Sequence, residues 1–195
     1  MKREYDMKLF KIRSNTKDYA SFLQKNYTTY YESIKYKALH EQKWKPFNME
    51  KYMIPEFEIL TSDTGKRNFQ FDFSSHPSPF YIFSENAVEA LKDILEPRGQ
   101  FLPIKTPSKR KNFIGYYPTN VIKGLVDLEK SGIYDLSLNF ETDNLKFRKN
   151  IAIDEYMFCI SESRNCVLFT EKFKERVEET KLNSFSFLPV DVDFV

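Results

Sequence analysis

The chain has 195 residues, enough for one large domain with its own hydrophobic core. Hydrophobic residues make up 41% of it, which excludes global disorder, and 30 basic against 28 acidic residues exclude a strong electrostatic field over the whole surface. No apolar run approaches the ~18 residues of a membrane span, the first ten residues lack a signal-peptide core, and two cysteines do not make a disulfide framework, so we expect a cytoplasmic protein that does not associate with membranes.

In the N-terminal half, the spacing of apolar residues predicts one helix and three strands. Alternation predicts a strand over residues 6–13, and aromatic and apolar residues three to four positions apart predict a helix over 19–36. Two further strands are expected over 57–60 and 68–73. The turn residues at 62–65 predict that these two strands form a hairpin.

In the C-terminal half, local patterns predict a basic loop followed by short elements. Residues 105–112 are polar and basic and read as a loop, and 120–130 reads as a short helix weakened by Gly124. Two short strands over 155–160 and 166–169 are joined by a polar turn. The tail at 191–194 alternates acidic and apolar residues, which is typical of a strand with an acidic face.

An internal repeat is the most informative feature of the sequence. Residues 82–104 and 168–190 align without a gap, at a constant offset of 86 positions. The identical pairs are Phe83/Phe169, Glu85/Glu171, Glu89/Glu175, Phe101/Phe187, Leu102/Leu188 and Pro103/Pro189. Each copy reads as a strand, a helix with an apolar face, and a second strand, so we expect two pseudo-repeated strand–helix–strand units.

Each predicted helix begins after a hydroxyl residue that can cap it. Ser84 and Thr170 are expected to accept a hydrogen bond from a free backbone N–H of the first turn, contributing about 1 kcal/mol each. Glu85 and Glu171 follow in the first turn, where the helix dipole favours an anion. We therefore expect an α+β fold: an antiparallel or mixed sheet with the two repeat helices packed on it.

The first copy of the repeat and its surroundings resemble a known family. The sequence PFYIFSENAVEALKDILEPRGQFLPI at 79–104, the Asp72-Phe73 pair, Asn120-Val121 and the closing block 167–190 resemble a bacterial immunity-protein family of polymorphic-toxin systems, the eleventh immunity class, first catalogued as a domain of unknown function. The turn at 181–184, Lys-Leu-Asn-Ser, departs from the Gly-Leu-Thr-Gly that the family often has there. The resemblance covers residues 55–195 of one domain and leaves 1–54 as a Tyr-rich N-terminal extension.

The resemblance implies a function based on binding. A member of this family is an antidote that binds a co-encoded toxin domain and blocks it by stoichiometric occlusion. The implied partner is a cognate toxin protein, and no cofactor is implied. Neither the activity of the toxin nor the oligomeric state of the antidote follows from the resemblance.

The residues themselves point to no catalytic, cofactor or metal site. The chain has two histidines, His40 and His76, and the spacing of Cys159 and Cys166 is not that of a zinc site. Five isolated glycines form no phosphate-binding motif. A hydrolase would need His40 or His76 beside a carboxylate in a polar pocket, so we expect no enzymatic activity.

Two sets of residues are candidates for binding a partner. Tyrosine and tryptophan carry large contact areas at interfaces, so one set could belong either to the core or to a partner contact; it comprises Tyr27, Tyr30, Tyr31 and Trp44. The basic loop supplies the other set: Lys109, Arg110 and Lys111. This loop could contact an acidic toxin surface, or it could serve a nucleic-acid or nucleotide-binding module, which is the alternative function and the less expected one because nucleic-acid signatures are absent.

Overall fold

The computed structural model describes residues 7–25, 27–67, 69–133, 145–149 and 153–195. Its strands are β1 (Leu9–Ser14), β2 (Ser21–Lys25), β3 (Glu56–Leu60), β4 (Phe73–Ser74), β5 (Tyr81–Ser84), β6 (Gly99–Leu102), β7 (Phe113–Pro118), β8 (Val121–Ile122), β9 (Leu145–Phe147), β10 (Met157–Ile160), β11 (Val167–Thr170), β12 (Phe185–Val190) and β13 (Val192–Phe194). Its helical segments are η1 (Tyr30–Glu32), α1 (Ile34–Tyr36), η2 (Lys37–Gln42), α2 (Glu85–Leu95), η3 (Glu96–Arg98) and α3 (Glu171–Glu179). The expected α+β class is confirmed.

The largest sheet is mixed and is built around the N-terminal strand. Within the described residues it contains five strands in the order β12-β1-β11-β10-β8, all antiparallel except the β8–β10 pair. β1 pairs with β11 on one side and with β12 on the other. The N-terminal segment, expected as an extension, therefore supplies an interior strand of this sheet.

A second sheet repeats this arrangement around β7. Its order in the described chain is β4-β5-β7-β6, and every pair is antiparallel. In both sheets, the two strands of a strand–helix–strand segment flank a central strand from elsewhere in the chain: β7 lies between β5 and β6, and β1 lies between β11 and β12. That the two segments are pseudo-repeats of one unit stays a prediction.

The central strands β7 and β1 also pair with their neighbours in the same register. Phe83 faces Ile114 across the β5–β7 pair, and its repeat equivalent Phe169 faces Phe10 of β1. On the other side, Phe101 faces Tyr116 and its equivalent Phe187 faces Ile12. Ile114 and Tyr116 are two residues apart, as are Phe10 and Ile12, so each residue of β1 has a counterpart in β7.

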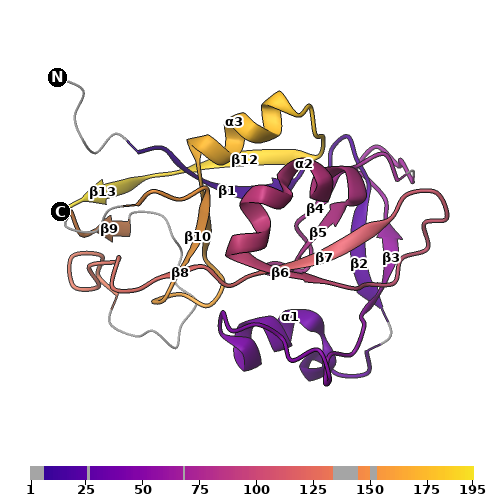
Figure 1. Ribbon diagram of the computed structural model, residues 1–195, viewed down its shortest axis with the longest axis horizontal. Coiled ribbons are helices and arrows are strands. Elements are labelled where there is room, and N and C mark those ends of the chain that lie inside the picture. The colour runs from indigo at the N-terminus through magenta and orange to yellow at the C-terminus, as the bar shows by residue number, and fades with distance from the viewer. Residues whose placement is uncertain (1–6, 26, 68, 134–144, 150–152) are drawn as a thin grey trace.

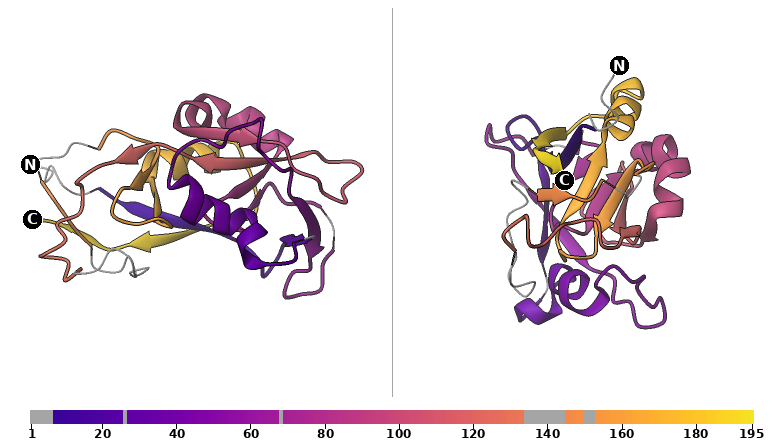
Figure 2. Two further views of the ribbon diagram at one scale, coloured as in Figure 1. Left: turned by 90° about the horizontal axis from the view of Figure 1, so that it is seen from below. Right: turned by 90° about the vertical axis from the view of Figure 1, so that its left-hand side faces the viewer.

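The two long helices lie side by side on one side of the molecule (Figure 1), and the shorter helical segments around α1 lie on the opposite side (Figure 2). α2 packs on β5 and β7, and α3 packs on β11. The Arg176 guanidinium of α3 joins the helices: it donates hydrogen bonds to both Asp93 carboxylate oxygens of α2, at 2.8 and 2.7 Å. Both bonds come from Nη2, and the pair links the two helices at the surface, where the Asp93 side chain is 59% exposed.

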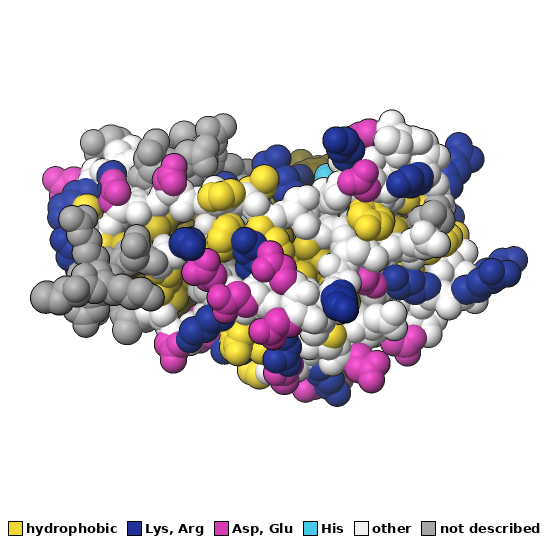
Figure 3. Space-filling model, turned by 90° about the horizontal axis from the view of Figure 1, so that it is seen from above, with side chains coloured by type: hydrophobic (Ala, Val, Ile, Leu, Met, Phe, Trp, Pro, Cys, Tyr) yellow, Lys and Arg dark blue, Asp and Glu magenta, His cyan; other side chains and the backbone are white. Residues whose placement is uncertain are grey.

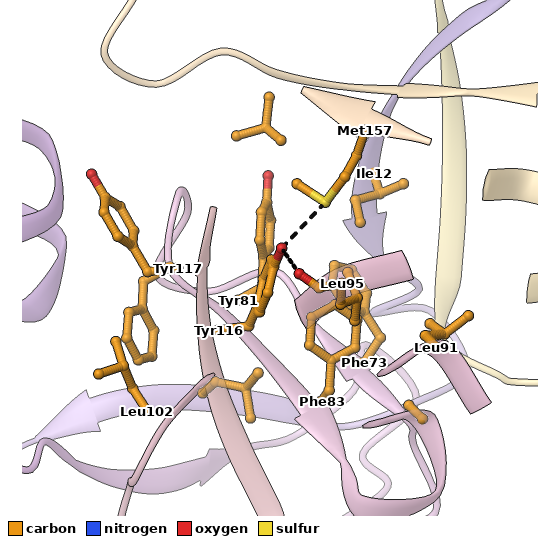
Figure 4. Packing of buried hydrophobic residues seen from close by; sticks show 14 of the residues in the cluster. Ile12, Phe73, Tyr81, Phe83, Leu91, Leu95, Leu102, Tyr116, Tyr117 and Met157 are labelled. Carbon is orange, nitrogen blue, oxygen red and sulfur yellow. Dashed lines mark hydrogen bonds between the residues drawn. The ribbon is translucent and has the colours of Figure 1, made fainter. Parts of the chain in front are cut away.

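The main core is aromatic and lies between the sheets and the two helices. Phe73 of β4 stacks on Phe185 of β12, with ring centroids 4.5 Å apart, so the core is continuous between the units. Tyr116 is fully buried, and its hydroxyl donates to the Leu95 carbonyl at 2.9 Å (Figure 4). Because a buried hydroxyl needs a partner, this bond fixes the end of α2 on β7.

One buried carboxylate, that of Asp72, also joins the units. Its Oδ1 accepts hydrogen bonds from the Ser84 hydroxyl (2.7 Å) and from the Lys111 ammonium group (2.8 Å). Its Oδ2 accepts from the backbone N–H of Asn183 (3.1 Å), just before β12. The start of α2, the loop after β6 and the turn before β12 are therefore tied to one side chain.

Two N-terminal predictions are wrong. Within the predicted helix 19–36, Ser21–Lys25 forms β2 and pairs with β3, and helical turns begin only at Tyr30. The predicted hairpin of 57–60 with 68–73 does not form, because β3 pairs with β2 instead and strand pairing in the latter segment begins at Phe73. Local spacing cannot identify a strand whose partner is more than thirty residues away. Asp6 and Asn68, where two strands were expected to begin, lie outside the described residues.

Of the C-terminal predictions, the strands are confirmed and the short helix is wrong. β10 and β11 form the expected antiparallel pair, and β13 forms the expected tail strand. Residues 120–130 contain β8 followed by turns, not a helix. Gly124 there has a backbone φ of +67°, a left-handed conformation that interrupts a right-handed helix.

Replacing Asp72 with alanine should lower the free energy of unfolding by about 3 kcal/mol. The change leaves the Lys111 ammonium group and the Asn183 N–H without their partner in a largely buried place. Urea denaturation measures the loss, and Asp63→Ala, at an exposed aspartate in the turn after β3, is the control. Equal stability of the two variants would contradict the role assigned to Asp72.

Candidate functional site

The aromatic residues singled out in the sequence separate into an exposed and a buried group. Tyr27, Tyr30 and Tyr31 are exposed, by 42%, 49% and 66%. Trp44 is buried: its indole N–H donates to the Ser163 carbonyl at 3.0 Å and its ring stacks on Tyr117. Trp44 therefore belongs to the core, and its interpretation as a candidate for partner contact is wrong.

The basic loop is divided in the same way. Lys109 and Arg110 are exposed. Lys111 turns inward, where its ammonium group donates to the Phe71 carbonyl and to Asp72, both at 2.8 Å. Lys111 is therefore corrected from a binding candidate to a structural residue, and the loop retains fewer cations for a partner than its sequence indicates.

Only one of the two predicted helix caps forms. The Ser84 hydroxyl accepts a hydrogen bond from the Ala87 N–H at 3.2 Å, as predicted. Thr170 occupies the corresponding position before α3, but its side chain makes no capping bond. Its hydroxyl donates instead to the carbonyls of Glu155 and Tyr156, so the predicted capping bond is wrong and Thr170 connects β11 to the segment before β10.

Tyr27 and Tyr30 lie at a large cleft that sequence reasoning did not find. The cleft has a volume of about 1030 Å³ and is walled by β1, β12, the Tyr-rich segment before α1 and the loop after β4. Its basic lining residues are Lys11 and Arg13 from β1, Lys35 from α1 and His76 from the loop after β4. The spacing of two along β1 places Lys11 and Arg13 on the same face of the sheet.

The charges in the cleft are all of one sign. None of the described residues that line it is acidic. Within the described part of the chain, Lys11, Arg13 and Lys35 form no ion pair. The face carrying α2 and α3 is different: there, basic and acidic side chains lie interspersed (Figure 3). Cations held together without anions attract a negatively charged ligand.

Hydrogen bonds between distant segments hold the walls of the cleft in place. The Ser14 N–H at the end of β1 donates to the Ser75 hydroxyl at 3.0 Å, and the Ser75 N–H donates to the Ser14 hydroxyl at 2.8 Å. This buried reciprocal pair places His76 beside the end of β1. The Gln24 side chain of β2 accepts from the Ile34 N–H at 2.9 Å, which fixes the start of α1 and thereby Lys35.

The positive charges of the cleft affect the pKa of His76. The pKa of the His76 imidazole is lowered from 6.5, first by its partial desolvation in the cleft wall and then by the positive charges of Lys35 and Arg13. Burial raises the pKa of the Cys166 thiol, at the base of the cleft, to about 12, so this cysteine stays protonated at neutral pH. The cleft thus contains a neutral imidazole, a neutral thiol and three cations.

The rim of the cleft is apolar. Leu23, Tyr27, Tyr30 and Leu188 line the cleft, and each is between 37% and 49% exposed. Large side chains that are exposed around a cavity are typical of binding surfaces. The arrangement can bind a molecule that is anionic where it enters the cleft and apolar where it meets the rim.

No group of three or more His, Cys, Asp or Glu side chains that could hold a metal ion occurs among the described residues. The described helices include none with the length and apolar character needed to cross a membrane. Comparison with protein-family models and with curated proteins finds no match for this chain. The resemblance to the immunity class therefore stays a prediction.

The pKa of His76 should lie below 6.5, and Lys35→Gln should raise it, because that variant removes a nearby positive charge. An NMR titration of the imidazole protons measures both, since the chain has only two histidines and His76→Gln assigns the signal. Lys109→Gln, outside the cleft, should leave this pKa unchanged. The same shift in both lysine variants would contradict the placement of Lys35 beside His76.

This pKa also has a consequence for stability. The unfolded chain, with an ordinary imidazole, binds the proton more readily than the folded protein, so folding becomes less favourable as the pH falls below 6.5. His76→Gln removes this contribution. Between about pH 7 and pH 5 the variant should therefore lose less unfolding free energy than the wild type.

Proposed function

We propose that the protein is an immunity protein that binds a cognate toxin domain and neutralises it by occlusion, without catalysing a reaction. The observation that supports this most is the cleft, where exposed tyrosines and leucines surround cations that have no anionic partner among the described residues. Tyrosine and arginine are enriched in protein interfaces, and a few such side chains provide most of the binding energy. The proposed contact residues are therefore Tyr27, Tyr30 and the cations of the cleft.

The resemblance to the immunity class supports the same proposal. Its motif includes Asp72, Ser84 and the helix α2, which build the scaffold and do not line the cleft. A shared scaffold with a variable contact surface suits a family whose members each bind a different toxin. As part of the proposal, the protein acts in the bacterial cytoplasm, where its two buried cysteines stay reduced.

The alternative, a nucleic-acid or nucleotide-binding module that uses the loop 105–111, has less support. Lys111 is engaged with Asp72, and the backbone of Lys105 pairs with residues 55 and 57 beside β3. Exposed aliphatic side chains such as Leu23 and Leu188 suit a polypeptide better than a phosphate backbone. We therefore retain a protein as the partner.

Co-expression with the product of the directly preceding gene tests the proposal. If that product is the toxin, the protein should restore growth of the host, and the two purified chains should form a one-to-one complex on size-exclusion chromatography with light scattering. Neither protection nor a complex would refute the proposed pairing. Binding to bulk RNA that charge reversal of Lys109 and Arg110 abolishes would favour the alternative.

Alanine substitution of Tyr27 and Tyr30 together should weaken toxin binding at least about tenfold, because it removes large contact areas at the rim of the cleft. Isothermal titration calorimetry measures the affinity. Met49→Ala with Leu60→Ala is the matched control: these side chains are 51% and 40% exposed and do not line the cleft. Equal weakening by both double variants would place the toxin elsewhere on the surface.

A further inference from the structure

We propose that the cleft receives an acidic polypeptide segment of the partner, with its carboxylates against Lys11, Arg13 and Lys35 and its apolar side chains against the rim. This inference rests on the proposed function, because it names the chemistry of the toxin at the same site. It adds the part of the toxin that is recognised: a protruding, negatively charged segment. The reasons come from the two similar sheets, from charge and from the shape of the cleft.

The first reason is a difference between the two central strands. Gly115 of β7 pairs with Leu102, and Lys11 of β1 pairs with Leu188, the repeat equivalent of Leu102. A Cβ atom on Gly115 would lie 2.3 Å from the Phe80 ring, so that face of β7 is filled. The matching face of β1 carries Lys11 and Arg13 and lines the cleft. The same position is thus packed in one sheet and open and cationic in the other.

The second reason is the repulsion among the cations of the cleft. Lys11, Arg13 and Lys35 come from two different segments and line the same cleft as His76, whose pKa Lys35 and Arg13 lower. Bringing like charges together is unfavourable, and none of the described lining residues is an acid that would offset it. A bound carboxylate would supply the missing charge, and the Arg13 guanidinium can hold it by two parallel hydrogen bonds.

The third reason concerns the class of anion. The cleft, at about 1030 Å³, is far larger than a single inorganic ion needs and is open to solvent. Leu23 and Leu188 stand exposed at its rim beside Tyr27 and Tyr30, and such aliphatic side chains suit a polypeptide better than a nucleotide base. These features favour a peptide with both acidic and apolar residues.

A peptide-binding experiment on the full chain tests the inference without the toxin. The probe is a fluorescein-labelled decapeptide rich in glutamate with two leucines, followed by fluorescence anisotropy at low and at physiological salt. A decapeptide with lysine in place of glutamate, a labelled thymidine decanucleotide and inorganic phosphate are the comparison ligands. The acidic peptide should bind, and its affinity should fall as the salt concentration rises. The basic peptide should not bind, and inorganic phosphate should compete only weakly with the acidic peptide.

Matched charge reversals place the binding in the cleft. The double variant Lys11→Glu, Arg13→Glu should weaken binding of the acidic peptide at least about tenfold. The double variant Lys109→Glu, Arg110→Glu changes the net charge by the same amount, but these residues lie outside the cleft. It should therefore weaken binding of the acidic peptide less than about twofold. If the β1 double variant is unfolded by circular dichroism, Lys35→Glu replaces it, because Lys35 is exposed and lies outside the sheets. Binding of the acidic peptide should also raise the pKa of His76, measured by NMR.

Several results would overturn the inference. They are the absence of acidic-peptide binding, equal weakening by both double variants, or tighter binding of the oligonucleotide than of the peptide. A toxin complex that forms normally with the Lys11→Glu, Arg13→Glu variant would also refute the inference while leaving the proposed function intact. Conversely, peptide binding in the cleft without any complex with the co-encoded toxin would support the inferred chemistry of the cleft and refute the proposed pairing.

Discussion

The buried Asp72 carboxylate is the contact on which the arrangement of the two units depends. It joins the first turn of α2, the loop after β6 and the backbone just before β12, and these segments are far apart in the sequence. β12 in turn pairs along its whole length with β1, which carries the cations of the cleft. A change at Asp72 would therefore reach the cleft through two steps of hydrogen bonding, although Asp72 does not line it.

The sequence was sufficient wherever the determinants of structure are local. The helix over 85–95 follows from a capping serine, an acidic first turn and an apolar face, and all three lie between Ser84 and Leu95. The position of β1 could not be predicted in this way, because its partners begin at Val167 and at Phe185. The repeat in the sequence also omits the central strands, so it revealed two strand–helix–strand segments but not the sheets they complete.

The candidate site was predicted only in part, for the same reason. Residue type singled out Tyr27, Tyr30, Tyr31 and Trp44 together and left core and partner contact open. Type alone could not separate Tyr30 from Trp44, whose partners Tyr117 and Ser163 are distant in the chain. The run Lys11-Ile12-Arg13 carried a signal, because charged residues on one face of an interior strand are unusual. That His76 and Lys35 join them depends on the Ser14–Ser75 and Gln24–Ile34 hydrogen bonds, which no local pattern reveals.

The contrast between β7 and β1 separates what the scaffold needs from what a partner needs. Where the face of a central strand serves stability alone, as at Gly115, close packing against Phe80 removes the space for a side chain. Filling the matching face of β1 in the same way would bury apolar surface and stabilise the fold. The chain instead places two cations there, beside exposed Leu188, and forgoes that burial. Giving up this burial on a face that does not serve the core supports the proposal that a ligand covers it.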